Sequence, residues 1–96
     1  MMKVDILAIG AHPDDVELSC AGTLAKEIGA GKSVAILDLT KGELGTRGNA
    51  DIRQKEAANA AEILGVTTRI NLGFADGFFQ NDRKHQDKIV SYIRHL

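Results

Sequence analysis

Cysteine, excess charge and long apolar runs are all nearly missing from this 96-residue sequence, and each absence excludes a class of protein. Cys20 is the only cysteine, so neither an intrachain disulfide nor a CxxC zinc or redox pair can form. No segment approaches the ~18 apolar residues of a membrane span. The apolar run at the N-terminus is interrupted by Asp5 and is too short for an export signal. We therefore expect a soluble cytoplasmic protein.

The charges nearly cancel. Twelve lysines and arginines oppose thirteen aspartates and glutamates, for a net charge of -1, and the basic residues are spread along the chain. This distribution gives no reason to expect binding to nucleic acid or to an anionic membrane. With 44% hydrophobic and 26% charged residues and no low-complexity tract, the chain is typical of an ordinary globular protein of one domain at most. We expect neither nucleic acid nor a membrane as a partner.

Apolar runs alternate with amphipathic segments along the chain. The pattern predicts strands over residues 4–9, 34–39 and 67–72, and helices over 16–30, over 51–64 and near the C-terminus around 89–96. A βαβαβα order predicts an α/β, Rossmann-like parallel sheet with flanking helices, because the crossovers are right-handed. We expect all these strands to be buried on both faces. Since so much burial needs more cover than three helices give, and no stop signal ends the last helix, we expect an incomplete half of a larger domain. A compact mini-domain is the alternative.

The residues after the first predicted strand occupy the place where open parallel sheets bind ligands. They read Gly-Ala-His-Pro-Asp-Asp-Val-Glu over positions 10–17. A dinucleotide-binding protein would place G-x-G-x-x-G here, but the later glycines are absent and the adjacent carboxylates of Asp14 and Asp15 would repel a phosphate. A nucleotide- or phosphate-binding module that uses Mg²⁺ is nevertheless the alternative function, because such modules also begin with an apolar strand followed by acidic residues.

A divalent metal gains from this combination of side chains, since imidazole and carboxylate are both normal zinc ligands. His12 and Asp15 lie three residues apart with Pro13 restricting the turn, so both can reach one ion. Asp14 would then be free to act as general base on a water whose pKa the metal lowers. A plainer interpretation is that the acids only cap the following helix. Catalytic zinc normally has three protein ligands, and this motif supplies two.

The whole set of motifs resembles one family. The segment 11–15 (Ala-His-Pro-Asp-Asp), followed by 20–25, 40–48, 53–57 and 72–77, is similar to the PIG-L/LmbE-type zinc deacetylases, which remove the acetyl group from N-acetylglucosamine-containing substrates. These blocks occur in family order over nearly the whole chain. The combination most resembles the bacterial branch that deacetylates N-acetylglucosaminyl-malate in bacillithiol biosynthesis. Other members act on chitin oligosaccharides or lipid-linked glucosamine.

The resemblance implies a role for each residue of the first motif. His12 and Asp15 would be zinc ligands, and Asp14 would be the base that later protonates the departing amine. The third ligand would be a histidine in a later His-Pro-Asp-His motif, because His85 and His95 lack the Pro-Asp context. Residues 1–96 would then be the N-terminal part of a single deacetylase domain, inactive alone, and the complete protein would be a homo-oligomer, a trimer or hexamer.

Further candidates surround this motif. In the glycine-rich loop of residues 40–49, Glu43 and Arg47 are candidates for binding the sugar, although a plain surface loop is equally consistent with the pattern.

Arg53, early in the second helix, suits sugar hydroxyls or a malyl carboxylate, and Glu56 could orient it as an i,i+3 pair unless it is an ordinary solvated charge. Asp76 either borders the pocket or makes an Asp-Gly turn. We expect Asp38 to be structural and Cys20 to be a small packed residue.

Overall fold

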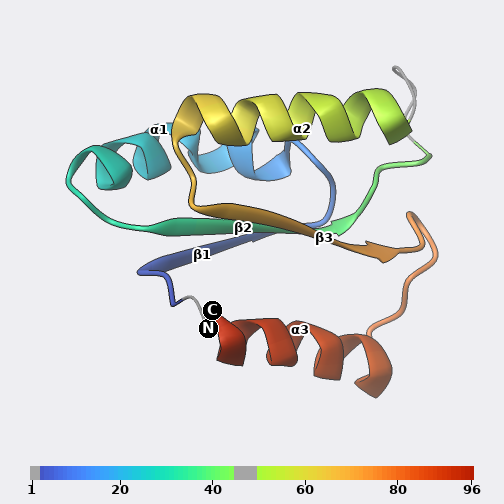
Figure 1. Ribbon diagram of the computed structural model, residues 1–96. Helices are drawn as coiled ribbons and strands as arrows, with labels where there is room; N and C mark the ends of the chain where they lie inside the picture. Colours follow the sequence, from blue (N-terminus) through green and yellow to red (C-terminus); the bar gives the residue numbers. More distant parts are fainter. Residues whose placement is uncertain (1–2, 45–49) are drawn as a thin grey trace.

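The computed structural model describes residues 3–44 and 50–96. Its elements follow the predicted order: β1 (Ile6–Gly10), α1 (Asp15–Gly29), β2 (Val34–Thr40), α2 (Ala50–Leu64), β3 (Thr68–Phe74) and α3 (Arg83–His95). Helices α1 and α2 cover one face of the sheet and α3 covers the other, so the chain forms three layers (Figure 1). The C-terminus lies beside the segment that leads into β1, where the amide of Val4 donates to the carbonyl of Leu96 at 2.9 Å.

The sheet has the strand order β1-β2-β3, and both strand pairs are parallel. The central strand β2 is buried along nearly its full length, which explains its continuous apolar sequence. The outer strands are different: β1 is only half-buried, and 43% of Ile9 is exposed. The prediction that all the strands are buried on both faces is therefore wrong for β1 and for most of β3. An outer strand has a neighbour on one side only, and its apolar sequence does not reveal that position.

Each face of the sheet has its own apolar core, because alternate residues of β2 point to opposite faces. Val34 and Ile36 pack against Val16 and Leu24 of α1. On the other face, Leu37 forms a cluster with Leu72 and Phe74 of β3, against which Ile89 and Tyr92 of α3 pack. No described helix is long and apolar enough to cross a membrane.

Helix α1 is not regular along its length. Cys20 has φ -143° and ψ 18°, which kinks the helix and separates its first turn from the remainder. The Cys20 side chain packs against the core on the α1 face, as expected for a small packed residue. The first turn and the remainder of α1 are therefore two helical segments joined at a kink.

The carboxyl ends of the strands meet at one edge of the sheet. There, the amide and the hydroxyl of Thr40 both donate to the carbonyl of Ala11, at 3.0 and 2.9 Å, which ties the loop after β1 to the end of β2. Gly10 allows α1 to start close to β1, because a side chain here would lie 3.1 Å from Val16 and 3.2 Å from Asp15. The loop that follows β1 thus leads directly into α1 at the ligand-binding edge.

Candidate active site

The turn from His12 to Asp15 closes on itself through both backbone and side chains. The amide of His12 donates to Oδ2 of Asp15 at 2.9 Å, and the amide of Asp15 donates to the carbonyl of His12 at 3.2 Å. Nδ1 of His12 lies 3.2 Å from the same Oδ2, and both side chains are 41% exposed. The two residues that the sequence proposes as metal ligands therefore face each other at the surface.

A third acid holds the other side of the imidazole. Nε2 of His12 lies 2.7 Å from Oδ1 of the buried Asp76, across 64 residues of sequence. The hydrogen bond from the amide of Leu44, together with that from His12, lowers the pKa of Asp76 below its ordinary value, although burial opposes this shift. An ionised carboxylate can only accept hydrogen bonds, so Nε2 of His12 carries a proton. Asp76 thus fixes how the imidazole is turned.

This arrangement leaves Nδ1 of His12 opposite an oxygen of Asp15 that can also only accept. Two lone pairs in this position repel unless a proton or a cation lies between them. Burial alone would lower the pKa of His12, but the hydrogen bonds with Asp76 and Asp15 raise it above its ordinary value. Nδ1 of His12 and Oδ2 of Asp15 therefore favour a positive charge between them.

Asp14 takes no part in this pair. It precedes α1 with φ 89°, and its side chain makes no capping hydrogen bond to the helix. It is the only non-glycine residue with positive φ among those described. The carboxylate is 57% exposed, and Nη2 of Arg53 lies 3.4 Å from its Oδ1. The plainer interpretation of Asp14 as a helix cap is therefore wrong: a strained backbone turns its carboxylate toward the open edge instead.

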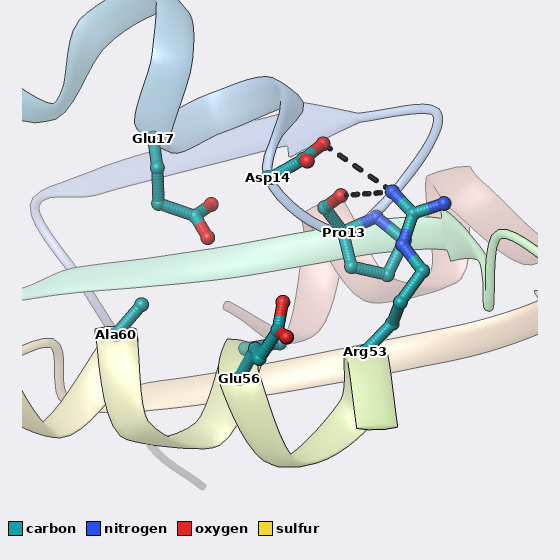
Figure 2. A pocket seen from close by; sticks show the side chains of 7 residues that line it. Pro13, Asp14, Glu17, Arg53, Glu56 and Ala60 are labelled. Atoms are coloured by element: carbon teal, nitrogen blue, oxygen red, sulfur yellow. Dashed lines mark hydrogen bonds and ion pairs between the residues drawn. The ribbon is translucent and has the colours of Figure 1, made fainter. Parts of the chain in front are cut away.

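Arg53 reaches from α2 to the loop after β1. Its guanidinium donates to the carbonyl of Pro13 at 2.8 Å (Figure 2). It also donates to the carbonyl of Gly42 at 3.3 Å. Gly42 has φ 69°, and a Cβ there would lie 2.5 Å from Nη1 of Arg53, so only glycine leaves room for the guanidinium. The expected pair between Arg53 and Glu56 does not form among the described residues, because Arg53 points to the strand ends instead.

Arg53 lines two hollows. One has a volume of about 210 Å³ and is lined by Pro13, Asp14, Glu17, Arg53, Glu56, Ala57 and Ala60, with the carboxylates of Glu17 and Glu56 pointing into the space between α1 and α2 (Figure 2). The other, of about 320 Å³, is lined by His12, Asp15, Leu44, Arg53 and Asp76. The proposed base thus lines one hollow and the proposed metal ligands line the other, and Arg53 lines both.

The loop after β2 contributes through Glu43 and Leu44. Oε2 of Glu43 accepts from the amide of Asp76 at 3.2 Å, and the amide of Leu44 donates to Oδ2 of Asp76 at 2.9 Å. Glu43 therefore supports Asp76, which lines the second hollow. Arg47, the other candidate in this loop, lies outside the described residues. Asp76 borders the hollow, which is one of the two alternatives left open by the sequence.

The sequence pattern did not predict the link between Asp76 and His12 or any role for Arg69. Asp38, expected to be structural, is buried and binds Arg69 at 2.7 Å. A charged residue inside an apolar strand was the available signal for Arg69. No comparable signal linked Asp76 with His12, because the two residues lie in loops that are distant in the sequence.

The family model described as GlcNAc-PI de-N-acetylase, PIG-L, matches residues 7–96. The chain belongs to the PIG-L family. The family predicted from the motifs is thereby confirmed, and the alternative of a nucleotide- or phosphate-binding module with Mg²⁺ is not favoured.

Relatives within the PIG-L family include curated and solved proteins. The chain is 49% identical over 71 residues to an uncharacterized deacetylase, YaiS, of Escherichia coli, covering 74% of this chain and 38% of that protein. It is 35% identical to the diacetylchitobiose deacetylase of Thermococcus kodakarensis over 96 residues, covering 93% of this chain and 36% of the relative.

Solved structures confirm the fold. The conserved protein TT1542 from Thermus thermophilus superimposes with a TM-score of 0.91 at 45% identity, covering 98% of this chain and 43% of that one. The N,N'-diacetylchitobiose deacetylase from Pyrococcus horikoshii gives a TM-score of 0.87 at 29% identity, covering 94% and 36%. The chain thus spans less than half the length of these PIG-L relatives.

Proposed function

We propose that the protein containing this chain hydrolyses the acetamide of an N-acetylglucosamine conjugate, with a zinc ion held by His12 and Asp15. The observation that carries the proposal is the convergence of these two side chains beside an Asp14 carboxylate that makes no capping bond. The names of the relatives support the substrate class. They include a diacetylchitobiose deacetylase and a 1D-myo-inositol 2-acetamido-2-deoxy-alpha-D-glucopyranoside deacetylase from Nakamurella multipartita, which is 38% identical over 87 residues.

The distance between the two candidate ligand atoms fits a zinc ion. Ligands about 2.0–2.2 Å from a tetrahedral zinc lie about 3.3 Å from one another, and Nδ1 of His12 lies 3.2 Å from Oδ2 of Asp15. Asp76 on Nε2 supplies the outer carboxylate that usually orients a ligating histidine. Within residues 3–44 and 50–96, no group of three or more His, Cys, Asp or Glu side chains completes a site. The proposal therefore keeps the third ligand in a later His-Pro-Asp-His segment.

Zinc, when bound, would lower the pKa of water and polarise the acetamide carbonyl. Asp14 then provides the proton transfers. Its carboxylate takes a proton from the attacking water as the water oxygen bonds to the acetyl carbon. It gives that proton to the nitrogen as the carbon–nitrogen bond breaks, leaving acetate and a free amine. The exposed edge position of Asp14 gives substrate access to it.

Arg53 and Glu43 are proposed to bind the sugar, and Arg47 is proposed with them on sequence alone. Arg53 lines both hollows and keeps its fork of donors near the strand ends, where hydroxyl groups can accept from it. One hollow is lined by three acids, Asp14, Glu17 and Glu56. Their negative charges favour a neutral sugar over an anionic group in that hollow. N-acetylglucosaminyl-malate stays the proposed substrate, and comparison of its acetate release with that of diacetylchitobiose tests the assignment.

The experiment uses the full-length protein and two histidine variants. We expect the wild type to contain zinc and release acetate, and His12→Ala to lose most of both. His95→Ala is the matched control, because His95 is exposed near the end of α3 and its Nδ1 lies 2.6 Å from the carbonyl oxygen of Ser91 in its own helix. It should keep its zinc and its activity. Undiminished zinc binding in His12→Ala would contradict the proposal.

A further inference from the structure

A buried arginine joins the sheet to both helices behind the candidate active site. From β3, Arg69 donates to Asp38 of β2 at 2.7 and 3.0 Å, and to Glu17 of α1 at 3.0 and 3.1 Å. The side chains are 8% exposed for Arg69, 2% for Asp38 and 19% for Glu17. Both carboxylates therefore bind the guanidinium through two oxygens, a geometry that fixes direction as well as distance.

The same guanidinium also reaches α2. Nη1 of Arg69 donates to the carbonyl of Ala57 at 3.2 Å. Ala57 lies one helical turn after Arg53, whose guanidinium contacts Pro13 and Asp14. Arg69 thus fixes α1 and α2 together at the points from which the two sides of the candidate site extend.

Stability alone does not account for these charges. Burial raises the pKa of Asp38 above its ordinary value, and Arg69 only partly opposes that effect. Burial alone would lower the pKa of Arg69, but its hydrogen bonds with Asp38 and Glu17 raise it. Buried ionic groups of this kind often stabilise a fold no more than apolar side chains of the same volume would. What apolar side chains would not supply is a fixed direction for each partner.

The direction matters because of the kink in α1. The kink at Cys20 separates the turn that begins at Asp15 from the rest of the helix. This turn is held by Val16, which is buried in the core, and by Glu17, which binds Arg69. Val16 packs the turn against the core, and the bidentate pair of Glu17 adds a contact of defined direction. Asp14 and Asp15 lie within three residues of Glu17 on this same turn.

We propose that Arg69 is a positioning residue: through Glu17 and Ala57 it sets the orientation of the Asp14–Asp15 turn relative to Arg53. Its effect on catalysis rests on the function proposed above. Its effect on the turn itself does not. Arg69 touches no reacting atom in this scheme and acts only through its partners.

The test compares Arg69→Lys and Glu17→Gln with Glu27→Gln in the full-length protein. Arg69→Lys keeps the charge but loses the planar fork, and Glu17→Gln loses one charge while keeping an accepting oxygen. Glu27→Gln removes the same charge from α1 beyond the kink. At a temperature where every variant is folded, we expect kcat to fall on the order of tenfold or more in the first two, with KM nearly unchanged. Glu27→Gln should match the wild type.

A second readout does not depend on activity. The amide of Leu18 donates to the carbonyl of Asp14 at 2.9 Å, so its hydrogen exchange reports whether the first turn is held. We expect faster exchange of this amide in Arg69→Lys and Glu17→Gln, and no change in Glu27→Gln. Wild type that releases no acetate would refute the proposed function but leave this readout decisive. Unchanged Leu18 exchange, or lower thermal stability with wild-type kcat and KM, would overturn the positioning role.

Discussion

The backbone at Asp14 offers a way to separate catalysis from folding. At φ 89° a side chain is strained by about 1–2 kcal/mol, and glycine is not. Glycine gives up about 0.4–1 kcal/mol through its freer unfolded state. Asp14→Gly should therefore be more stable than Asp14→Ala by about 1 kcal/mol. The contact with Arg53 at 3.4 Å is exposed and is lost equally in both variants, so it cancels from the comparison.

Urea denaturation of the full-length variants measures this difference, and acetate release measures activity. Both Asp14 variants should lose about 10²- to 10⁴-fold in kcat, the usual contribution of a general base. Asp87, an exposed acid within the regular helix α3, is the matched control. There the order should reverse, with Asp87→Gly less stable than Asp87→Ala by up to about 1 kcal/mol and activity unchanged. Equal stability of the two Asp14 variants would refute the strained backbone, and kcat within tenfold of the wild type would refute Asp14 as the base.

Three further predictions concern single residues. Gly42→Ala should displace Arg53, because the added Cβ would lie 2.5 Å from its Nη1, and we expect KM for the sugar to rise severalfold while zinc content stays normal; an unchanged KM would argue against Arg53 as a sugar ligand. Asp76→Ala should weaken zinc binding on the order of 10- to 100-fold, and Asp76→Asn less, since an amide oxygen can still accept from His12; equal zinc affinity in titration would contradict the orienting role. The backbone hydrogen bond that Asp82 accepts at the start of α3 lowers its pKa below the ordinary 3.8, so its stabilising effect is present above that pH and is lost as the pH falls through the lower folded value. The stability difference between wild type and Asp82→Ala in urea should therefore shrink below about pH 4. A difference independent of pH would count against the ionised Asp82 carboxylate as the cap of α3.

Local sequence signals predicted the elements and part of the site. The apolar runs identified the strands. A strand covered on both faces, such as β2, is apolar at successive positions and does not alternate between apolar and polar residues. The facing of His12 and Asp15 follows from their spacing around Pro13, which lies within a single turn. Both predictions depend on residues that are neighbours in the chain.

The rest of the site depends on contacts between distant segments. The bond from His12 to Asp76 spans 64 residues, and that from Arg69 to Glu17 spans 52. Whether these pairs meet is decided by the register of parallel strands and by the path of the loops, neither of which is encoded in a short motif. The expected pairing of Arg53 with Glu56 fails for the same reason. The loop after β1 offers Arg53 a carbonyl partner that helical spacing cannot reveal.

The most direct test of the central claim is anomalous diffraction at the zinc edge from crystals of the full-length protein. We predict one strong peak within bonding distance of Nδ1 of His12 and of the Asp15 carboxylate. Nε2 of His12 should stay hydrogen-bonded to Asp76, and Asp14 should lie outside the coordination shell. A peak bonded to Asp14 in place of Asp15, or zinc bound elsewhere in an active enzyme, would contradict the account.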